Sequence, residues 1–256
     1  MSAEIFLNEM KGLVARIYSS QLPNIQQAAG HIADSIEAGR MVHLFGAGHS
    51  AIPVMEAFPR IGGFVGFHPL IELPLSFNGQ VIGQMGMHQA SFLEKTQGYA
   101  EAILSNYVLS DQDCMMVFSH SGINALPVEM AKAGKDRGLK VIVVVSQAHS
   151  LAQNVRHPAG RLGDNAHVVI DNCVPEGDAL VDIPGMAYRV ASGSTIAACI
   201  IVDSVVAETA KRLAARGVEP LVYPSHNVAT TPEAEASMFE HEMRVLAAYR
   251  ELQRKL

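Results

Sequence analysis

Cysteine is scarce in this sequence, and its three copies are widely spaced, at Cys114, Cys173 and Cys199. No two of them form a CxxC pair, so we expect neither a disulfide framework nor a zinc site built on thiolates. Each cysteine lies in an apolar stretch, where a free thiol behaves as a small buried hydrophobe. The histidines show no HExxH spacing, and we expect no metal and no other cofactor.

Long hydrophobic runs are also absent. The longest are Val141–Val145 and Ile196–Val202, far short of the roughly 20 residues that span a bilayer. The first eleven residues are polar and of mixed charge, so we expect no signal peptide. The net charge is −6 and no lysine/arginine cluster occurs, which argues against nucleic acid, because binding its phosphates needs a basic patch. We expect a cytoplasmic protein that binds neither membranes nor nucleic acid.

Short apolar segments alternate with helical patterns along the chain. The patterns predict helices over 5–18, 25–36, 51–60, 99–107, 125–137, 194–215 and 232–254, and strands at 41–45, near 64–65, and at 114–118, 141–145 and 167–170. Such alternation predicts an α/β, doubly wound fold with a parallel sheet covered on both faces. We expect one domain over 1–256, with N-terminal helices in 1–40, the α/β core in 41–217, and a loop and helix in 218–256.

The first strand runs directly into a glycine-rich turn, Gly46-Ala47-Gly48-His49-Ser50. Glycine permits a positive φ and a close approach of backbone to ligand, and the next helix begins with free amides and the positive end of its dipole. Ser50 adds a hydroxyl. The pattern is GxGxS rather than GxGxxG, so a nucleotide site is not favoured. Tight helix–sheet packing is the alternative explanation for the two glycines.

A second turn, after the strand at 114–118, contains Ser119, His120, Ser121 and Asn124. Its hydroxyls and exposed amides can donate to a phosphate, although helix capping also explains the serines. Because parallel strands end at the same edge of a sheet, the two turns are expected to form one crevice there. A third polar cluster, at 192–195, begins the long helix and adds Ser194 and Thr195, which favours a shared anion site.

These motifs resemble those of the SIS (sugar isomerase) superfamily, which includes phosphosugar isomerases and phosphosugar-binding domains. The resemblance is closer to the UPF0309 group, and it covers nearly the whole chain. The similar stretches are HLFGAGHS at 43–50, RIGGFVGFHPLIE at 60–72, FSHSGINALPVEMA at 118–131, RHPAGRL at 156–162, VIDNC with GDA at 169–179, and ARGVEPLVYPSHN at 215–227.

The resemblance implies a Rossmann-like, flavodoxin-like fold of three layers with a five-stranded parallel sheet. It further implies a homodimer or homotetramer with sites near the subunit interface. The phosphate-binding role is transferred to Ser50, Ser119 and Ser121, and to Ser194 or Thr195. In phosphoheptose isomerases, metal-ligand and base positions follow the first glycine turn. Here Glu56 stands in the place of that branch's histidine and Arg60 in that of its glutamate, which argues against a zinc-dependent mechanism.

Four residues are candidates for acid–base catalysis. Glu56 follows the first turn, but an i,i+4 ion pair with Arg60 would explain it equally well. Glu176 and Asp178 precede the third polar cluster, where arabinose-phosphate isomerases carry a catalytic glutamate; solvated loop charges are the alternative. His49, like His120, lies within a ligand loop and could move a proton or donate to a phosphate.

His226 is a further substrate-binding candidate, which could reach a site from another subunit. The sequence thus predicts a phosphosugar-binding protein and favours an aldose–ketose isomerase that works by proton transfer. A non-catalytic sugar-phosphate sensor, or a lyase or etherase acting on an amino-sugar phosphate, remains open.

Overall fold

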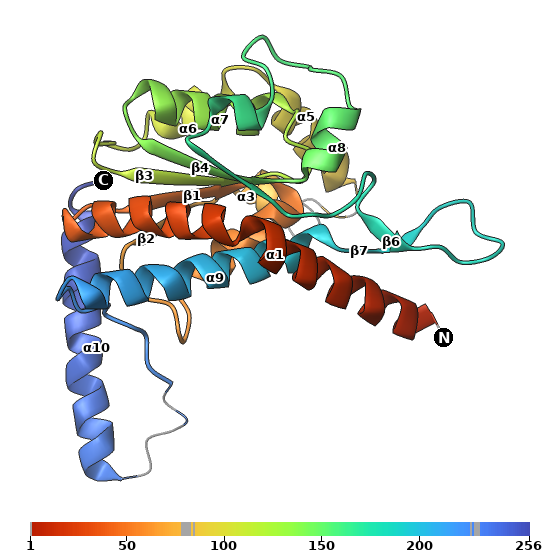
Figure 1. Cartoon of the computed structure of the whole chain (residues 1–256). Coiled ribbons are helices and arrows are strands. Elements are labelled where there is room, and N and C mark those ends of the chain that lie inside the picture. The colour runs from red at the N-terminus through yellow and green to blue at the C-terminus, as the bar shows by residue number, and fades with distance from the viewer. Residues whose placement is uncertain (1, 78–82, 84, 226, 228–230) are drawn as a thin grey trace.

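A five-stranded parallel sheet forms the centre of the computed structural model, which describes residues 2–77, 83, 85–225, 227 and 231–256. The strand order is β2-β1-β3-β4-β5 (Figure 1), with bounds β1 Val42–Gly46, β2 Phe67–Leu70, β3 Cys114–Phe118, β4 Lys140–Val145 and β5 Val168–Asp171. Gly46 pairs in register with Phe118, and Val145 pairs with Asp171. The strands therefore end together at one carboxyl edge, as the alternating pattern predicted.

Helices cover both faces of the sheet (Figure 1). On one face lie α1 (Ser2–Glu37), α2 (Ile52–Ala57) and α9 (Ser194–Ala215); on the other lie α5 (Gly86–Lys95), α6 (Tyr99–Leu104), α7 (Ala125–Asp136) and α8 (Gln147–Ala152). Each face buries its own hydrophobic cluster, and successive residues of β1 alternate between them, Leu44 to the first and Phe45 to the second. A strand buried on both faces requires this alternation. The three-layer arrangement is confirmed.

The N-terminal segment forms one continuous helix, α1, where the sequence predicted two. Pro23 lies inside it and removes a backbone donor, which costs a helix interior about 3 kcal/mol. The buried face nevertheless continues across the proline, since Gln21 and Ile25 are both buried and Asn24 donates to Gln21 Oε1 at 3.0 Å. Packing against α9 and β5 compensates for the lost donor.

The predicted strand near 64–65 is wrong: β2 begins at Phe67. Phe64 instead forms an isolated antiparallel bridge with Val222. Pro69 is tolerated in β2 because β2 is an edge strand, and one of its sides forms no backbone hydrogen bonds to a neighbouring strand. Further short elements lie where no regular structure was predicted: the 3-10 turns η1 (Gly48–Ala51) and η2 (Leu162–Asn165), the helix α3 (Leu73–Ser76), α5, α8, and an antiparallel pair, β6 (Ala179–Val181) with β7 (Val190–Ser192).

The last helix, α10 (Pro232–Gln253), begins at Thr231, whose hydroxyl accepts from the Ala234 amide at 3.2 Å, as the predicted N-cap requires. Its C-terminal end lies at the amino edge of the sheet (Figure 1). There the Val108 amide donates to a terminal oxygen of Leu256 at 2.8 Å, and Lys255 donates to the Gly39 carbonyl. The end of the chain is thus held opposite the carboxyl edge.

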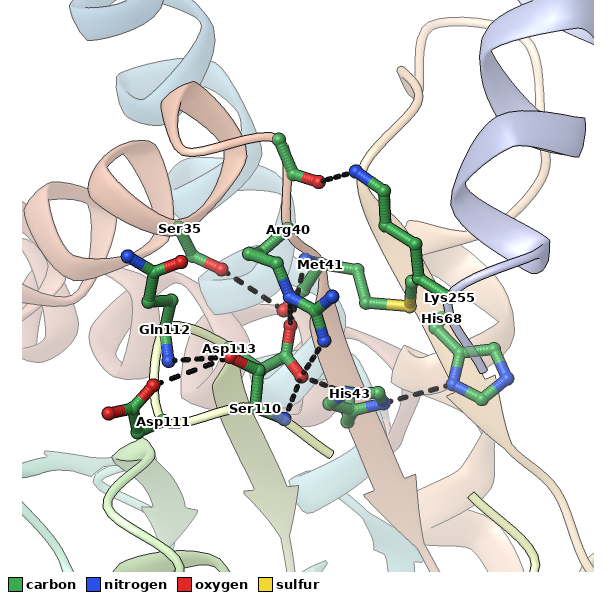
Figure 2. A network of polar contacts seen from close by, with 11 residues as sticks. Ser35, Arg40, Met41, His43, His68, Ser110, Asp111, Gln112, Asp113 and Lys255 are labelled. Atoms are coloured by element: carbon green, nitrogen blue, oxygen red, sulfur yellow. Dashed lines mark hydrogen bonds and ion pairs between the residues drawn. The ribbon is translucent and has the colours of Figure 1, made fainter. Parts of the chain in front are cut away.

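A buried polar network holds the amino edge together (Figure 2). Arg40 donates to both carboxylate oxygens of Asp113, at 2.9 and 2.8 Å, and the Ser110 amide donates at 2.7 Å. Burial alone would raise the pKa of Asp113, but its contacts with His43 and Arg40 hold it well below its usual range. His43 Nδ1 lies 3.0 Å from His68 Nδ1, so one ring donates and the other accepts. These contacts fix the starts of β1 and β3.

Candidate functional site

The loop after β1 turns so tightly at Gly46 that only glycine fits. A Cβ at this position would lie 2.0 Å from the Ser50 carbonyl oxygen, and Gly48 has a φ of +58°. The Ser50 amide donates to the Ala47 carbonyl at 3.1 Å. The turn therefore holds Ser50 and its neighbour His49 at the carboxyl edge of the sheet.

The loop after β3 is shaped by Ser119 and Gly122. Ser119 is buried, and its Oγ accepts from the Gly122 amide at 3.2 Å, which leaves its O–H to donate. Gly122 has a φ of +61°, and a Cβ there would lie 2.6 Å from Val145 Cγ2. The serine thus serves as a loop cap and still keeps a hydrogen-bond donor.

The two loops meet at a narrow cleft of about 10 Å³, which is roughly the room of one water molecule. The sheet continues from β1 to β2 on one side and from β3 to β4 on the other, so the cleft lies at the switch point where open α/β sheets place ligands. Six predicted site residues line it, together with Pro53, Phe118, Val144, Asn172 and Ala198; the six are His49, Ser50, Ser119, His120, Ser194 and Thr195.

The first turn of α9 already binds a carboxylate from the same chain. Asp178 accepts hydrogen bonds from the Gly193 and Ser194 amides, at 3.1 and 2.8 Å, and from the Ser194 hydroxyl at 2.9 Å. Its φ of +69° is one that aspartate adopts more readily than most residues, and its charge suits the helix dipole. Asp178 therefore caps the helix and engages Ser194, while Thr195 faces the cleft.

His120 is the most enclosed titratable group of the cleft. Burial is the main cause that lowers its pKa; Asp178 and Asp171 act in the opposite direction, and His149 lowers it further. The rings of His120 and His149 lie 4.9 Å apart, centroid to centroid. His120 is therefore a neutral imidazole at neutral pH.

A second cavity, of about 210 Å³, adjoins the first at His49. It lies between the turn after β1 and helix α5, and Ser91 and Glu94 of α5 are among its polar groups. Sequence reasoning missed both residues because the stretch before α6 has no clear apolar period that would place a helix there. Together the two cavities form one region, with the narrow, polar cleft at one end and the wider cavity at the other.

Glu56 lies outside both cavities. It forms an ion pair with Arg60, the alternative that its i,i+4 spacing offered, and both residues line a separate cavity of about 180 Å³ beside Asp203. Glu176 is exposed and accepts from the Gln153 side chain at 2.7 Å. Neither carboxylate reaches the cleft.

Two further predicted residues belong to the loop after β3 without lining the cleft. Ser121 follows His120, and Asn124 is the N-cap residue of α7, although its side chain makes no capping hydrogen bond. His226 lies outside the described residues. Within the described ranges, no three His, Cys, Asp or Glu side chains are grouped so that they could hold a metal ion, and no helix is both long and apolar enough to cross a bilayer.

Comparison with known proteins places these features in a family. The sequence profile of the SIS domain matches residues 5–146. A UPF0309 protein of Listeria innocua is 32% identical over 86% of this chain and 87% of its own length. The fold is similar to that of a phosphoheptose isomerase from Neisseria gonorrhoeae, with a TM-score of 0.51, 13% identity and coverage of 80% and 95% of the two chains.

A further similar fold is the sugar isomerase domain of an RpiR transcription factor from Sphaerobacter thermophilus, with a TM-score of 0.50, 14% identity, and coverage of 94% of this chain and 97% of that one. At such identities the two structures establish a shared fold, whereas the profile match and the relative at 32% identity establish the family. This chain belongs to the SIS domain family and, within it, to the UPF0309 group.

Proposed function

We propose that this protein binds a sugar phosphate at the carboxyl edge of the sheet and interconverts its aldose and ketose forms by proton transfer. The observation that carries the proposal is the convergence of Ser50, Ser119 and Thr195 on one cleft, which has to widen beyond the room of one water molecule to admit a phosphoryl group. These three hydroxyls come from three separate elements, and hydroxyl donors suit the oxygens of a phosphoryl group. Family membership supports the same ligand class.

His49 is the acid–base residue of this proposal. It lines both the cleft and the adjoining cavity, so a sugar phosphate that extends from one to the other would pass beside the imidazole. A catalytic base has to be within hydrogen-bond reach of the proton it removes. Of the four catalytic candidates, His49 alone lines the two cavities.

One observation favours the sensor alternative. Among the described residues that line the cleft there is no carboxylate, although carboxylates are common bases in proton transfer. The RpiR neighbour, named for its sugar isomerase domain within a transcription factor, fits this alternative too. Each stabilising ligand should therefore be incubated with the protein and followed by NMR. Interconversion supports the isomerase, and a ligand that binds but stays unchanged supports the sensor.

Binding is tested by thermal unfolding against sugar phosphates, the matching free sugars and inorganic phosphate. A ligand at 100 times its Kd adds about 2.7 kcal/mol of stability, which for a chain of this size raises Tm by about 5–10 °C. We expect phosphorylated ligands alone to do so. If free sugars stabilise the protein equally well, the phosphoryl site is wrong.

Two isosteric substitutions on one helix form a matched pair for this test. Thr195→Val removes a hydroxyl from the cleft, whereas Thr209→Val removes a buried hydroxyl on the same helix α9 that has no hydrogen-bond partner in the described part of the chain. A hydrogen bond to a charged group contributes about 1.5–3 kcal/mol. We expect Thr195→Val to weaken phosphate binding by about 10- to 100-fold and Thr209→Val to leave it unchanged.

We also propose that the chain acts in the cytoplasm as a homo-oligomer. Its three cysteines are free, as suits a reducing compartment. A groove of about 760 Å³ runs between α1 and the start of α9 and is almost entirely apolar; Leu7, Tyr18 and Ile196 are well-exposed members of its wall. The N-terminal turns of α1 extend away from the central sheet (Figure 1), and the same groove on a second copy can pair with this one about a two-fold axis.

Light scattering coupled to gel filtration tests this assembly. Leu7→Glu places a charge in the groove, and Asn8→Glu adds the same charge to an exposed position that does not line it. We expect the first variant to be monomeric and the second to keep the wild-type mass. A wild-type protein that is monomeric at high micromolar concentration refutes the proposal.

A further inference from the structure

Asn172 connects the end of β5 to the cleft. The residue is 2% exposed, and its backbone amide donates to the Val145 carbonyl at 2.9 Å. The side-chain oxygen Oδ1 accepts from the Val174 amide at 3.0 Å. Since a backbone N–H can only donate, this contact fixes the orientation of the amide group and directs Nδ2 to the other side.

On that other side, Asn172 Nδ2 lies 3.4 Å from His120 Nδ1. An amide nitrogen donates and has no lone pair to accept, so His120 Nδ1 has to be the acceptor. In a neutral imidazole one nitrogen accepts and the other carries the proton. The proton of His120 is therefore on Nε2.

His120 Nε2 is enclosed and has no hydrogen-bond partner within the part of the chain that the structure describes. An enclosed donor without a partner destabilises the structure, because the hydrogen bond it made to water is not replaced. His120 lines the cleft beside Ser50 and Thr195, so an oxygen of a molecule bound there can accept from Nε2–H and remove this cost.

The environment of His120 favours the neutral ring, because burial is the largest influence on its pKa and lowers it. Asp178 and Asp171 favour the charged ring, while burial and His149 disfavour it. His149 itself is oriented by the Gly177 amide, which donates to its Nδ1 at 3.1 Å, so a neutral His149 carries its proton on Nε2 as well. His120 therefore lines the cleft as a neutral imidazole with its proton on Nε2, and not as an imidazolium.

We infer that Asn172 is a positioning residue: it locks His120 in the Nε2–H tautomer, so that the imidazole serves as a neutral hydrogen-bond donor to a phosphoryl oxygen. The tautomer part stands on the geometry alone, and the acceptor rests on the proposed function. A base at this nitrogen is excluded by the same geometry, since Nε2 already carries the proton. His120 thereby differs in role from His49.

The tautomer can be measured directly on the full chain labelled with ¹⁵N-histidine. Protonated and unprotonated ring nitrogens have well-separated ¹⁵N shifts, and the signals of His120 are identified by their loss in His120→Gln. We expect Nε2 protonated and Nδ1 unprotonated at pH 7. A protonated Nδ1, or a ring protonated at both nitrogens, overturns the inference.

Asn172→Asp tests whether Asn172 selects the tautomer of His120. A carboxylate of the same shape accepts from the Val174 amide and also from His120, so the proton should move to Nδ1 and the pKa of the ring should rise by about one to three units. Asn154→Asp, at an exposed position, makes the same change of charge and should leave the His120 signals in place. If Asn172→Asp keeps the Nε2–H tautomer, Asn172 is not the positioning residue.

Addition of inorganic phosphate and, separately, of fructose 6-phosphate tests the acceptor. We expect both ligands to shift the Nε2 signal of the wild type. In Asn172→Asp, the shift caused by each ligand should differ from the shift it causes in the wild type. A shift with the sugar phosphate alone overturns the phosphoryl assignment, and no shift with either overturns the donor role. In that last case, Tm shifts that depend on Thr195 would leave the proposed function intact, whereas their absence would mean that it has failed as well.

Discussion

Replacing Asp178 separates two roles that its position allows, a helix cap and a catalytic carboxylate. As a cap it accepts from two backbone amides and one hydroxyl at the start of α9. Loss of an N-cap costs about 0.5–2 kcal/mol, and alanine at a left-handed φ of +69° adds about 1–2 kcal/mol. We therefore expect Asp178→Ala to lower stability by about 1.5–4 kcal/mol, and Tm by about 3–16 °C.

Asp178→Asn keeps the side-chain oxygen that accepts from the amides and keeps a residue that tolerates this φ. It removes the charge, whose interaction with the helix dipole is worth about 0.3–1 kcal/mol, so Tm should fall by only ~1–4 °C. Because Ser194 and Thr195 stand next to each other at the cleft, loss of this negative charge should also tighten phosphate binding.

Scanning calorimetry with phosphate titration reads out both effects, and Asp182→Asn is the matched control. Asp182 is an exposed partner of Arg189 in the neighbouring hairpin, where an ion pair contributes little. The capping argument is refuted if Asp178→Asn leaves both Tm and phosphate binding unchanged. Should the same variant lose turnover by more than 100-fold, the carboxylate is catalytic, since acid–base groups contribute about 10²–10⁴-fold.

Two further predictions concern the glycine turn and the amino edge. Gly46→Ala should abolish phosphate binding, because its Cβ would lie 2.0 Å from the Ser50 carbonyl oxygen. Gly48→Ala has nothing within 4 Å of its Cβ and should cost only about 1–2 kcal/mol of left-handed strain. Circular dichroism melts and a phosphate titration compare the two variants, and equal losses in both contradict the steric argument. Burial, and then the nearby His43, lower the pKa of His68 to about 4, so the unfolded chain binds more protons between pH 6.5 and 4 and stability should fall over this window as pH falls, by about 2–3 kcal/mol. His68→Gln should flatten that part of the urea-derived stability profile, and an unaltered slope refutes the assignment.

Local sequence patterns predicted four of the five strands of the sheet and their common carboxyl edge, but misplaced β2. The helix at 194–215 was predicted with the bounds that α9 has, because its apolar residues repeat at helical spacing between a polar start and Gly217. The two ligand loops were found because glycine and serine follow buried strands directly. Both features follow from residues that are close together in the sequence, so they can be recognised from the sequence alone.

The chemistry of the cleft depends on contacts between distant residues. Asp178 reaches the amides at 193 and 194 because β6 and β7 bring the two ends of an antiparallel pair together, and that pair was predicted as a polar loop. Asn172 meets His120 from 52 positions away. No periodicity encodes either contact, so sequence reasoning predicted Asp178 as a catalytic residue and gave Asn172 no role.

The polar groups at the carboxyl edge fall into two sets, and the distinction bears on how an anion is bound. Asp178, Asn172 and the Ser194 hydroxyl are engaged within the chain, whereas Thr195, Ser50 and His120 line the cleft, and His120 Nε2 has no hydrogen-bond partner among the described residues. The described residues that line the cleft include no lysine or arginine. A phosphoryl group held by neutral donors gains little from long-range attraction, which salt would screen, so its recognition depends on the directions of a few hydrogen bonds. Residues that only fix those directions, as Gly46 fixes the turn, then matter as much as the donors themselves.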